Sequence, residues 1–521
     1  MHQSPETASS LTRRDLLRAL AAMGLAGLSP RLRAEPRFAE VPFTLGVASG
    51  YPRPDGMVLW TRLATQPLIP GGGMSPEVVA VGWEIALDPG FREISATGTA
   101  YATPEWAHSV HVEPRGLAPD REYWYRFHAG EASSPIGRTR TAPAKDAAPG
   151  HLRLGVGSCQ HYEQGWFVAY RHVVADDLDL FLHVGDYIYE GSAGRAGVRS
   201  HGAPEPHTLE DYRRHFALYK SDPDLQSAHA SCPWLVVWDD HELENDYAGD
   251  RSENDDEPAW FLQRRAAAYK AYYEHMPLPR AMVPFGPHLR LHSRVGYGQL
   301  ANIHMLDNRQ YRTPQPCPRP GRAGSNFIED CPDRLNPQAS MLGARQEAWL
   351  KAGLDASKAR WNLLGQQTLM AQADGRAGPG EVFFSDGWDG YPAARRRLLE
   401  HLSERRPGNP VVLGGDLHSF WVSDLKPDFN DAESPVVASE LVATSITSDP
   451  PPEERIQTAV SEGPHIRFAT GVRRGYLRLD LTPQRLTADL RGVASVLDPD
   501  SGCETLASFV VEDGRPGPQS A

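Results

Sequence analysis

Four short stretches carry side chains of the types that bind metal ions, and each stretch follows an apolar run. An apolar run of five or six residues predicts a buried strand, and a buried carboxylate is costly unless an opposite charge pairs with it. If the four strand ends meet at one sheet edge, they bury like charges together unless cations are present. The sequence therefore predicts a metal site formed by Gly157-Ser158-Cys159-Gln160-His161, Gly185–Glu190 (GDYIYE), Trp238–Asp246 (WDDHELEND) and Gly414–His418 (GGDLH).

The second of these stretches is the one around which the rest of the chain is organised. The apolar residues between Leu178 and Val184 predict a strand covered on both faces, and Gly185 then allows a tight turn into Asp186. Ligands bind at the carboxyl ends of such strands in open α/β sheets, so Asp186 and Tyr189 are the first site candidates. Taken alone, Asp186 could simply cap the next segment. The prediction depends on the coincidence of four strand ends.

The donor types indicate two kinds of cation. A thiolate from Cys159 and a phenolate from Tyr189 suit iron better than magnesium or calcium. Oxygen donors suit hard cations, and a carboxylate with two oxygens can bridge between the two kinds. We therefore expect a mixed site with one redox-capable ion, bridged by Asp186 to a hard ion whose oxygen donors are Asp186, Asp240, Asn245 and Asp416.

Short strands separated by turn residues predict an all-β segment from about Phe43 to Thr141. The run from Leu117 to Phe127 alternates with a period of two and places a tyrosine near the start of a strand, as in the tyrosine corner of β-sandwiches. We expect a fibronectin-like or Ig-like sandwich over residues 41–143, followed by a linker that ends near Gly150. This segment shows no catalytic cluster.

From Leu152 onward, strand and helix patterns alternate. They predict an α/β (α+β) catalytic domain of two β-rich sheets flanked by helices, over residues 151–512. Residues 436–446, 476–481 and 486–493 are expected to belong to a second, partly antiparallel sheet. The other predicted strands are 152–156, 178–184, 234–238, 301–306, 361–365 and 411–414, and the predicted helices are 166–174, 209–219, 259–275, 344–356 and 393–404.

Composition excludes some functions and the N-terminus suggests a destination. The net charge of −13 argues against binding nucleic acid through a basic patch, and no window after residue 34 is apolar enough to be a transmembrane segment of the mature chain. Residues 1–34 contain SLTRRDLLR, an apolar run and a plausible cleavage point after Ala34, which together resemble a twin-arginine signal peptide. An amphipathic N-terminal helix is the alternative. We expect export by the twin-arginine machinery to the periplasm or the medium.

Five cysteines are too few for a disulfide scaffold in a chain of 521 residues. Cys317 and Cys331 bracket a loop rich in Pro and Gly, and after export they are the expected disulfide, worth on the order of 3 kcal/mol. Cys232 precedes an apolar strand and is expected to be buried, while Cys503 has no evident role.

The ordered motifs GSC, GDYIYE, WDDHExxND and GDLH resemble the PhoD-type alkaline phosphatases. The resemblance covers nearly the whole chain after residue 34 and implies a calcineurin-like metallophosphatase fold, a mixed Fe(3+) and Ca(2+) centre, and hydrolysis of phosphate monoesters or diesters. Further motifs that carry it are GVASG at 46–50, VLWTR at 58–62, LDNRQYR at 306–312 and DGWDGY at 386–391.

The resemblance also implies roles for individual residues. His241 would donate to the phosphate or to the leaving oxygen, with a core histidine as the alternative reading. Some relatives have Arg where this chain has Glu190, which leaves the phosphate-holding cation open, with Arg309 or Arg312 as candidates. The catalytic candidates are thus His241, Asp186 and Arg309; Cys159, Asp186 and Tyr189 would bind iron, and Asp240, Asn245, Asp416 and His418 would lie at the remaining metal positions.

Bound cations would neutralise phosphate oxygens and activate a water or oxo nucleophile. The expected substrates are small phosphate esters, and phospholipids or teichoic-acid-like polymers also fit. One alternative is a phospholipase D-like phosphodiesterase that acts on lipid head groups. Two others are a binding protein that uses its sandwich and has only a structural metal cluster, and a redox enzyme that uses the iron.

Overall fold

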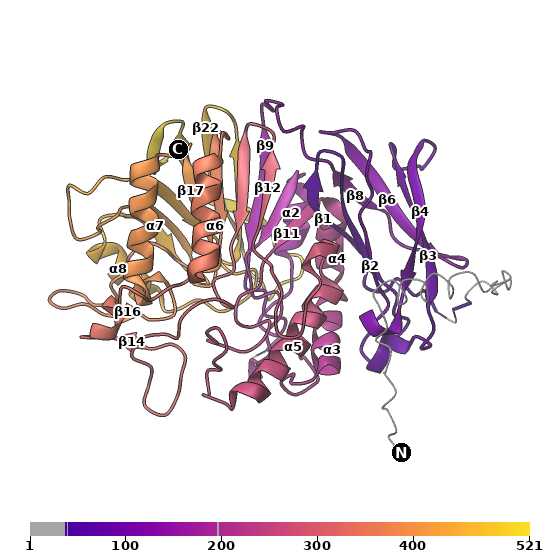
Figure 1. Ribbon diagram of the computed structural model, residues 1–521, viewed down its shortest axis with the longest axis horizontal. Helices are drawn as coiled ribbons and strands as arrows, with labels where there is room; N and C mark the ends of the chain where they lie inside the picture. Colours follow the sequence, from indigo (N-terminus) through magenta and orange to yellow (C-terminus); the bar gives the residue numbers. More distant parts are fainter. Residues whose placement is uncertain (1–36, 39, 195–196) are drawn as a thin grey trace, which may run out of the picture. The chain divides into compact units, whose positions relative to one another are not determined.

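The structure is a computed structural model that describes residues 37–521 other than 39, 195 and 196. The predicted signal peptide, 1–34, lies outside the described residues. The described chain forms two large sheets, one of ten strands and one of seven, with helices beside them (Figure 1).

The ten-stranded sheet contains three of the four strands that were expected to end in metal ligands. Neighbouring strands β9, β10, β11 and β1 run parallel, so the carboxyl ends of β9, β10 and β11 lie on the same side. The order is β24 (Arg515–Ser520), β23 (Cys503–Glu512), β22 (Arg485–Val493), β21 (Gly475–Leu481), β9 (Leu152–Gly157), β10 (Leu180–His183), β11 (Pro233–Val236), β1 (Val47–Arg53), β2 (Gly56–Arg62) and β5 (Ser109–Val112).

The seven-stranded sheet contains the fourth strand, β17. The central strands of this sheet, β13, β15, β17 and β19, are parallel. The expectation that all four strands end at one edge of one sheet is therefore wrong, because an apolar run does not show which strand it pairs with. The 476–481 and 486–493 strands, expected in the second sheet, are β21 and β22 of the first. The order is β12 (Ser293–Tyr297), β13 (Ala301–Met305), β15 (Trp361–Gly365), β17 (Pro410–Gly414), β19 (Ala438–Val442), β18 (Phe420–Leu425) and β20 (Ile466–Thr470).

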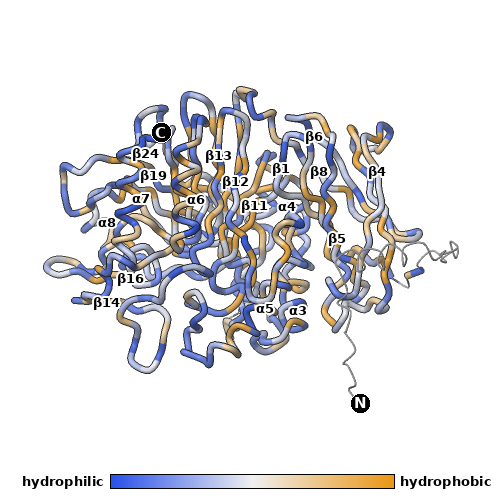
Figure 2. Tube along the Cα trace, in the orientation of Figure 1, coloured by the Kyte–Doolittle hydropathy of each residue, from blue (hydrophilic) through white to orange (hydrophobic). Residues whose placement is uncertain are grey.

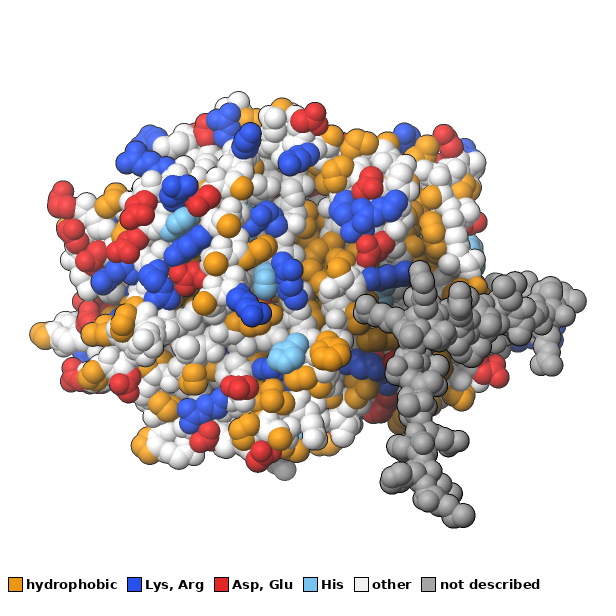
Figure 3. Space-filling view, viewed as in Figure 1, with side chains coloured by type: hydrophobic (Ala, Val, Ile, Leu, Met, Phe, Trp, Pro, Cys, Tyr) orange, Lys and Arg blue, Asp and Glu red, His pale blue; other side chains and the backbone are white. Residues whose placement is uncertain are grey.

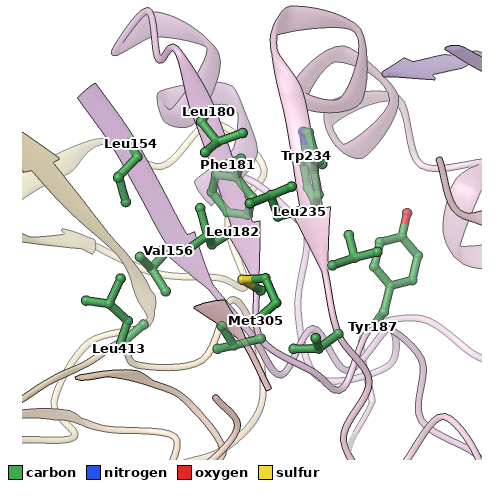
Figure 4. Close-up of a cluster of buried hydrophobic side chains, with 14 of the residues drawn as sticks. Leu154, Val156, Leu180, Phe181, Leu182, Tyr187, Trp234, Leu235, Met305 and Leu413 are labelled. Carbon is green, nitrogen blue, oxygen red and sulfur yellow. The ribbon is translucent and has the colours of Figure 1, made fainter. Parts of the chain in front are cut away.

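The two sheets share a hydrophobic core. Leu154 and Leu182 of the first sheet pack in one cluster with Met305 and Leu413 of the second (Figure 4). Along β17 the side chains alternate, because Leu413 joins this shared core while Val412 packs under the helices on the other face. Both faces are apolar, which explains the uninterrupted hydrophobic runs of the central strands (Figure 2).

Helices cover the strands on both sheets. Helices α6 and α7 lie beside each other in contact, and α3 packs on α5 (Figure 1). Helix α3 starts at Thr208, whose side chain forms a capping box with Asp211, and α4 was not predicted. The helices are α2 (Ala169–Ala175), α3 (Leu209–Lys220), α4 (Pro223–Ser231), α5 (Pro258–His275), α6 (Gly343–Ala356), α7 (Pro392–Arg405) and α8 (Glu453–Glu462), with short turns η1 (Pro70–Gly73), η2 (Pro104–Trp106), η4 (Arg280–Met282), η5 (Pro332–Leu335) and η6 (Trp388–Gly390).

The expected N-terminal sandwich shares a layer with the large sheet. Its own sheet has the order β4 (Ile94–Ala102), β3 (Val79–Ala86), β6 (Glu122–Ala129), β7 (Ala132–Ser133), with β8 (Gly137–Arg140) paired to β6. Its core also includes Met57 and Val110 from β2 and β5 of the ten-stranded sheet, whereas Val58 belongs to the hydrophobic core that the two large sheets share. The sandwich is therefore not a separate two-sheet body, and the boundaries 41–143 and 151–512 stay predictions. The Tyr123 hydroxyl accepts from the Ala118 N–H at 2.9 Å, as expected of a tyrosine corner.

Several smaller expectations can be compared with the structure. Cys317 and Cys331 form a disulfide, and Cys232 is buried. The last strand, β24, pairs with β23 and extends to Ser520, and the domain end at residue 512 stays a prediction.

On the face drawn in Figure 3, Lys and Arg side chains are interspersed with Asp and Glu. Among the described residues, no helix has the length and apolar character needed to span a membrane. A two-stranded ribbon, β14 (Phe327–Ile328) with β16 (Phe383–Phe384), completes the fold.

Candidate metal centre

The turns that follow the strands hold the site residues in a strained backbone conformation. Cys159, Asp186, Asp416 and His418 all have positive φ, between 52° and 64°. Such a conformation costs about 1–3 kcal/mol for each non-glycine residue and is concentrated at functional sites. Hydrogen bonds between the turns offset this cost, since the Cys159 N–H donates to the Gly185 carbonyl at 3.1 Å. A Cβ at Gly185 would lie 2.5 Å from Asp239 Cβ, so only glycine fits there.

One group of donors combines sulfur, oxygen and nitrogen. One ligand atom from each of Cys159, Asp186 and His418 lies within 4.8 Å of the other two. The Tyr189 hydroxyl lies 2.9 Å from Asp186 Oδ2 and 3.1 Å from His418 Nε2. His418 Nδ1 lies 2.6 Å from the Asp449 carbonyl, to which it must donate, so the neutral ring keeps a lone pair on Nε2. The structure thus brings these four predicted residues together, and one of them, His418, is in the tautomer that can bind a metal.

A second set of donors consists of carboxylates around the same Asp186. Asp186 belongs to three groups of potential ligands, one with Cys159 and His418, one with Asp240 and His241, and one with Asp239 and Asp416. Three buried oxygens, Asp186 Oδ1, Asp240 Oδ1 and Asp416 Oδ2, have no hydrogen-bond partner among the described residues. Orphaned carboxylate oxygens of this kind point to cations.

Burial and neighbouring charges raise the pKa values of the groups in this cluster. Burial raises the pKa of Asp416 to about 8, against the opposing effect of Arg309 and with the help of Asp240. Burial also raises the pKa of Asp186 well above its usual range, and the neighbouring carboxylates add to the effect. The pKa of the Tyr189 phenol is raised by burial and by Asp186, so a phenolate at this position needs a cation beside it.

Arg309 compensates part of the negative charge. Its side chain is fully buried, its Nε donates to Asp239, and its Nη2 lies 2.7 Å from Asp386 and 3.4 Å from Asp240. Arg312 also donates to Asp386, at 2.7 Å. Both guanidinium groups pair with carboxylates, and Arg312 also donates to the Asn308 and Asp386 carbonyls, but Nη2 of each lacks a hydrogen-bond partner among the described residues. Arg309 links the carboxylates of the acidic cluster, and a phosphate-holding role for either arginine stays a prediction.

Glu190 has a defined partner, which accounts for a carboxylate at this position. It accepts from His241 Nδ1 at 2.7 Å and from the Asn245 N–H at 2.8 Å. Burial alone would lower the pKa of His241, but Glu190, Asp186 and Asp240 raise it well above its usual range. The pKa of Glu190 falls to about 2 because His241 outweighs the effect of burial. The opposite shifts of the two pKa values favour a charged His241–Glu190 pair in which Nδ1 donates to the carboxylate.

Asn245 is the predicted ligand with the least support. Its side chain is half-buried, and its hydrogen bond at the site is the one that its backbone N–H donates to Glu190. The acidic cluster continues past it through Asp246, which forms a potential metal-binding group with Asp240 and Asp386.

Several residues at the centre were not predicted from the sequence. Glu242 is buried and accepts the N–H groups of Asp186, Tyr187 and Asp239, so it fixes the two turns that carry the carboxylates. Ser448 Oγ lies 2.8 Å from both the Tyr189 hydroxyl and the Cys159 carbonyl. Glu242 lies inside the WDDHE motif, which was a usable signal. Ser448 is in no motif, so no sequence pattern indicated it.

Comparison with known proteins identifies the family. The model of the family described as PhoD-like phosphatase matches residues 154–490, and that of the PhoD-like phosphatase N-terminal domain matches residues 28–143. The chain belongs to the PhoD-like phosphatase family. It is 43% identical over 494 residues to Alkaline phosphatase D of Bacillus subtilis (strain 168), covering 93% of this chain and 83% of that protein. A solved structure described as "Structure of PhoD" superposes with a TM-score of 0.89 at 43% identity, covering 93% of each chain.

The comparisons confirm the resemblance that the motifs carried and the enzyme class, a phosphoric ester hydrolase. The donor set itself fits metal ions, because it combines orphaned carboxylate oxygens with a thiol, a phenol and a histidine in the ligand tautomer. Within this PhoD-like fold, the Asp186 cluster is the candidate active site.

Proposed function

We propose that this PhoD-like phosphatase hydrolyses phosphate monoesters and diesters at the Asp186 cluster, with Fe(3+) and Ca(2+) bound. The observation that carries the proposal is the sharing of Asp186 between a Cys159–His418 group and an all-carboxylate group. Soft and strongly donating ligands on one side of a carboxylate and hard oxygens on the other suit two different cations. The calcineurin-like description of the two-sheet core belongs to the same proposal.

Particular residues would hold each ion. Cys159, Tyr189 and His418 surround one side of Asp186 and would hold iron, with Asp186 as the bridge. When bound, the cations would neutralise phosphate oxygens and lower the pKa of a water molecule that attacks phosphorus. The hard-ion donors on the other side of the bridge would be Asp240, Asn245 and Asp416.

The chain's own residues have two tasks in this reaction. Glu190 accepts from His241 Nδ1 and thereby orients the ring, so that Nε2 can donate to an oxygen of the ester. Because His241 is held as a cation, it can also deliver a proton to a leaving oxygen. Arg309 and Glu242 position the carboxylates and the turns without contacting substrate.

Export through the twin-arginine machinery is a further part of the proposal. The SLTRRDLLR segment supports it, and so does the Cys317–Cys331 disulfide, since disulfides persist in oxidising compartments.

Metal analysis combined with an ester panel tests the proposal. The purified protein should contain iron and calcium and absorb visible light through a phenolate-to-ferric transition that Tyr189→Phe removes. It should hydrolyse p-nitrophenyl phosphate and its bis-ester faster than phosphatidylcholine. A colourless protein with stoichiometric zinc, or preference for phosphatidylcholine, would contradict the proposed centre or the proposed substrate, respectively.

A further inference from the structure

A column of aromatic rings runs through the candidate site and includes His161, which has no role in the proposed function. The ring centroids of His241 and Tyr189 lie 4.1 Å apart, those of Tyr189 and His161 4.5 Å, and those of His161 and His201 5.5 Å. His241 stacks on Tyr189 and His161 is tilted against it by 34°, and two rings this close to a third cannot share one face of it. His161 therefore covers the face of Tyr189 opposite His241.

The structure holds His161 in place from several sides. Its N–H donates to Ser448 Oγ at 3.3 Å, and its carbonyl accepts from Thr447 Oγ1 at 2.8 Å. The residue is only 6% exposed. Because the backbone and both ring faces are packed, the ring cannot rotate freely, as expected of a group preorganised for a ligand.

The hydrogen bonding of the ring determines where its proton lies. His161 Nδ1 accepts the N–H of Glu163 at 3.2 Å, so this nitrogen carries a lone pair and the proton is on Nε2. Nε2 hydrogen-bonds to none of the described residues and is not one of their fully buried, unpaired polar atoms. Its N–H is therefore open to an acceptor that binds at the site.

We propose that the His161 Nε2–H donates to a phosphoryl oxygen of the bound ester, from the side of Tyr189 opposite His241. The inference rests on the proposed function and adds a substrate contact to it. A phosphate ester presents several oxygens, and a hydrogen bond from an N–H to a charged oxygen is stronger than one to a neutral acceptor. In this arrangement His241 contributes charge and His161 contributes a neutral donor in a fixed direction.

The alternative is that His161 only packs against Tyr189, and three variants separate the two roles. His161→Phe keeps a ring but lacks the N–H, while His161→Gln places an amide N–H near the position of Nε2. His201→Phe, one ring further along the column, is the matched control. Steady-state kinetics with p-nitrophenyl phosphate and calorimetric binding of inorganic phosphate supply the two readouts, with iron and calcium content measured for each variant.

We expect His161→Phe to lower kcat/KM and phosphate affinity by roughly 10- to 150-fold, as loss of a hydrogen bond to a charged group predicts. His161→Gln should recover most of this loss, and metal content should be unchanged. Phosphate affinity in His161→Phe equal to that of the wild type would overturn the inference, as would equal losses in the Phe and Gln variants. If the wild type hydrolyses no ester, the proposed function falls, and phosphate binding still decides the role of His161.

Discussion

The parallel strands of the two sheets have very different chemistry at their two ends. At the carboxyl ends of β9, β10, β11 and β17, four residues adopt positive φ and three buried carboxylate oxygens lack hydrogen-bond partners among the described residues. At the opposite ends, a cavity of about 700 Å³ borders the residues that precede β13, β15 and β17.

The charges that line this cavity are exposed or paired. Arg360, with a side chain 48% exposed, forms an ion pair with Asp513 at 2.6 Å. The charges around this cavity are thus exposed or paired, whereas the carboxyl ends of the strands hold buried charges without partners. In this protein, backbone strain and unpaired buried charge mark the candidate active site.

The largest effect should come from Asp186→Asn, which removes the shared carboxylate at the strained end. We expect phosphatase activity to fall roughly a thousand-fold, since charge stabilisation at the reacting group is lost. In the metal-free protein, however, the free energy of unfolding should rise, because the buried Asp186 carboxyl, whose raised pKa opposes folding at neutral pH, is removed. Activity assays and urea unfolding in a chelator check both. A metal-free variant less stable than the wild type would show that Asp186 is already compensated.

The second prediction compares two arginines, Arg309 at the carboxyl ends of the parallel strands and Arg360 at their amino ends. Arg309→Met should lower the free energy of unfolding by about 3–5 kcal/mol, because it leaves Asp239 buried without its cation and leaves Asp386 with Arg312 alone. Arg360→Met at the cavity should cost at most about 1 kcal/mol, as exposed ion pairs do. Urea denaturation of the two variants measures the difference. Similar costs would mean that the two ends do not differ in electrostatic compensation.

The loop closed by the Cys317–Cys331 disulfide contacts the acidic cluster at the carboxyl ends of the strands. Ser325, inside the loop closed by Cys317 and Cys331, donates its N–H to Asp246 Oδ2 at 3.0 Å. Replacing both cysteines by serine should cost about 3 kcal/mol of stability, and activity should fall because Asp246 loses this donor. Cys503→Ser, a free and half-buried cysteine, is the control and should change neither. Full activity in the double variant would show that the disulfide loop does not contribute to the candidate site.

The smallest effect is expected at the amino end of β9. Asp480 accepts from His151 and Arg153, and these partners lower its pKa despite partial burial. Its contribution to stability is present above the ordinary carboxyl pKa and is lost as the pH falls through the lowered value. Asp480→Asn should therefore cost no more than about 1 kcal/mol at pH 7, with the difference vanishing in acid. Thermal unfolding from pH 7 to pH 3 measures it, and a difference that grows in acid would contradict the assignment.

The sequence predicted individual strands well and their partners poorly. Residues 361–365 are β15 as predicted, because a short apolar run bounded by polar residues identifies a buried strand. The pairing of β1 with β11, from Ser49 to Pro233, depends on contacts between distant parts of the chain that no local pattern encodes.

The candidate site shows the same limit. Cys159, Asp186 and His418 meet as the motifs implied, because motif residues follow strand ends. Glu242 and Ser448 act through backbone groups of other segments, and the partners of Arg309 depend on its burial. Such roles are determined by tertiary packing and could not be predicted from a single sequence.

The ten-stranded sheet draws its strands from both ends of the described chain, and this constrains the order of folding. Strand β9 lies between β10 and β21, and β21 begins only at Gly475. Until that late segment has been synthesised, β9 presents an open edge that can pair with another chain. Contacts over such sequence distances also slow folding. A chain that stops before Gly475 should therefore aggregate through β9 before its metal ligands can assemble.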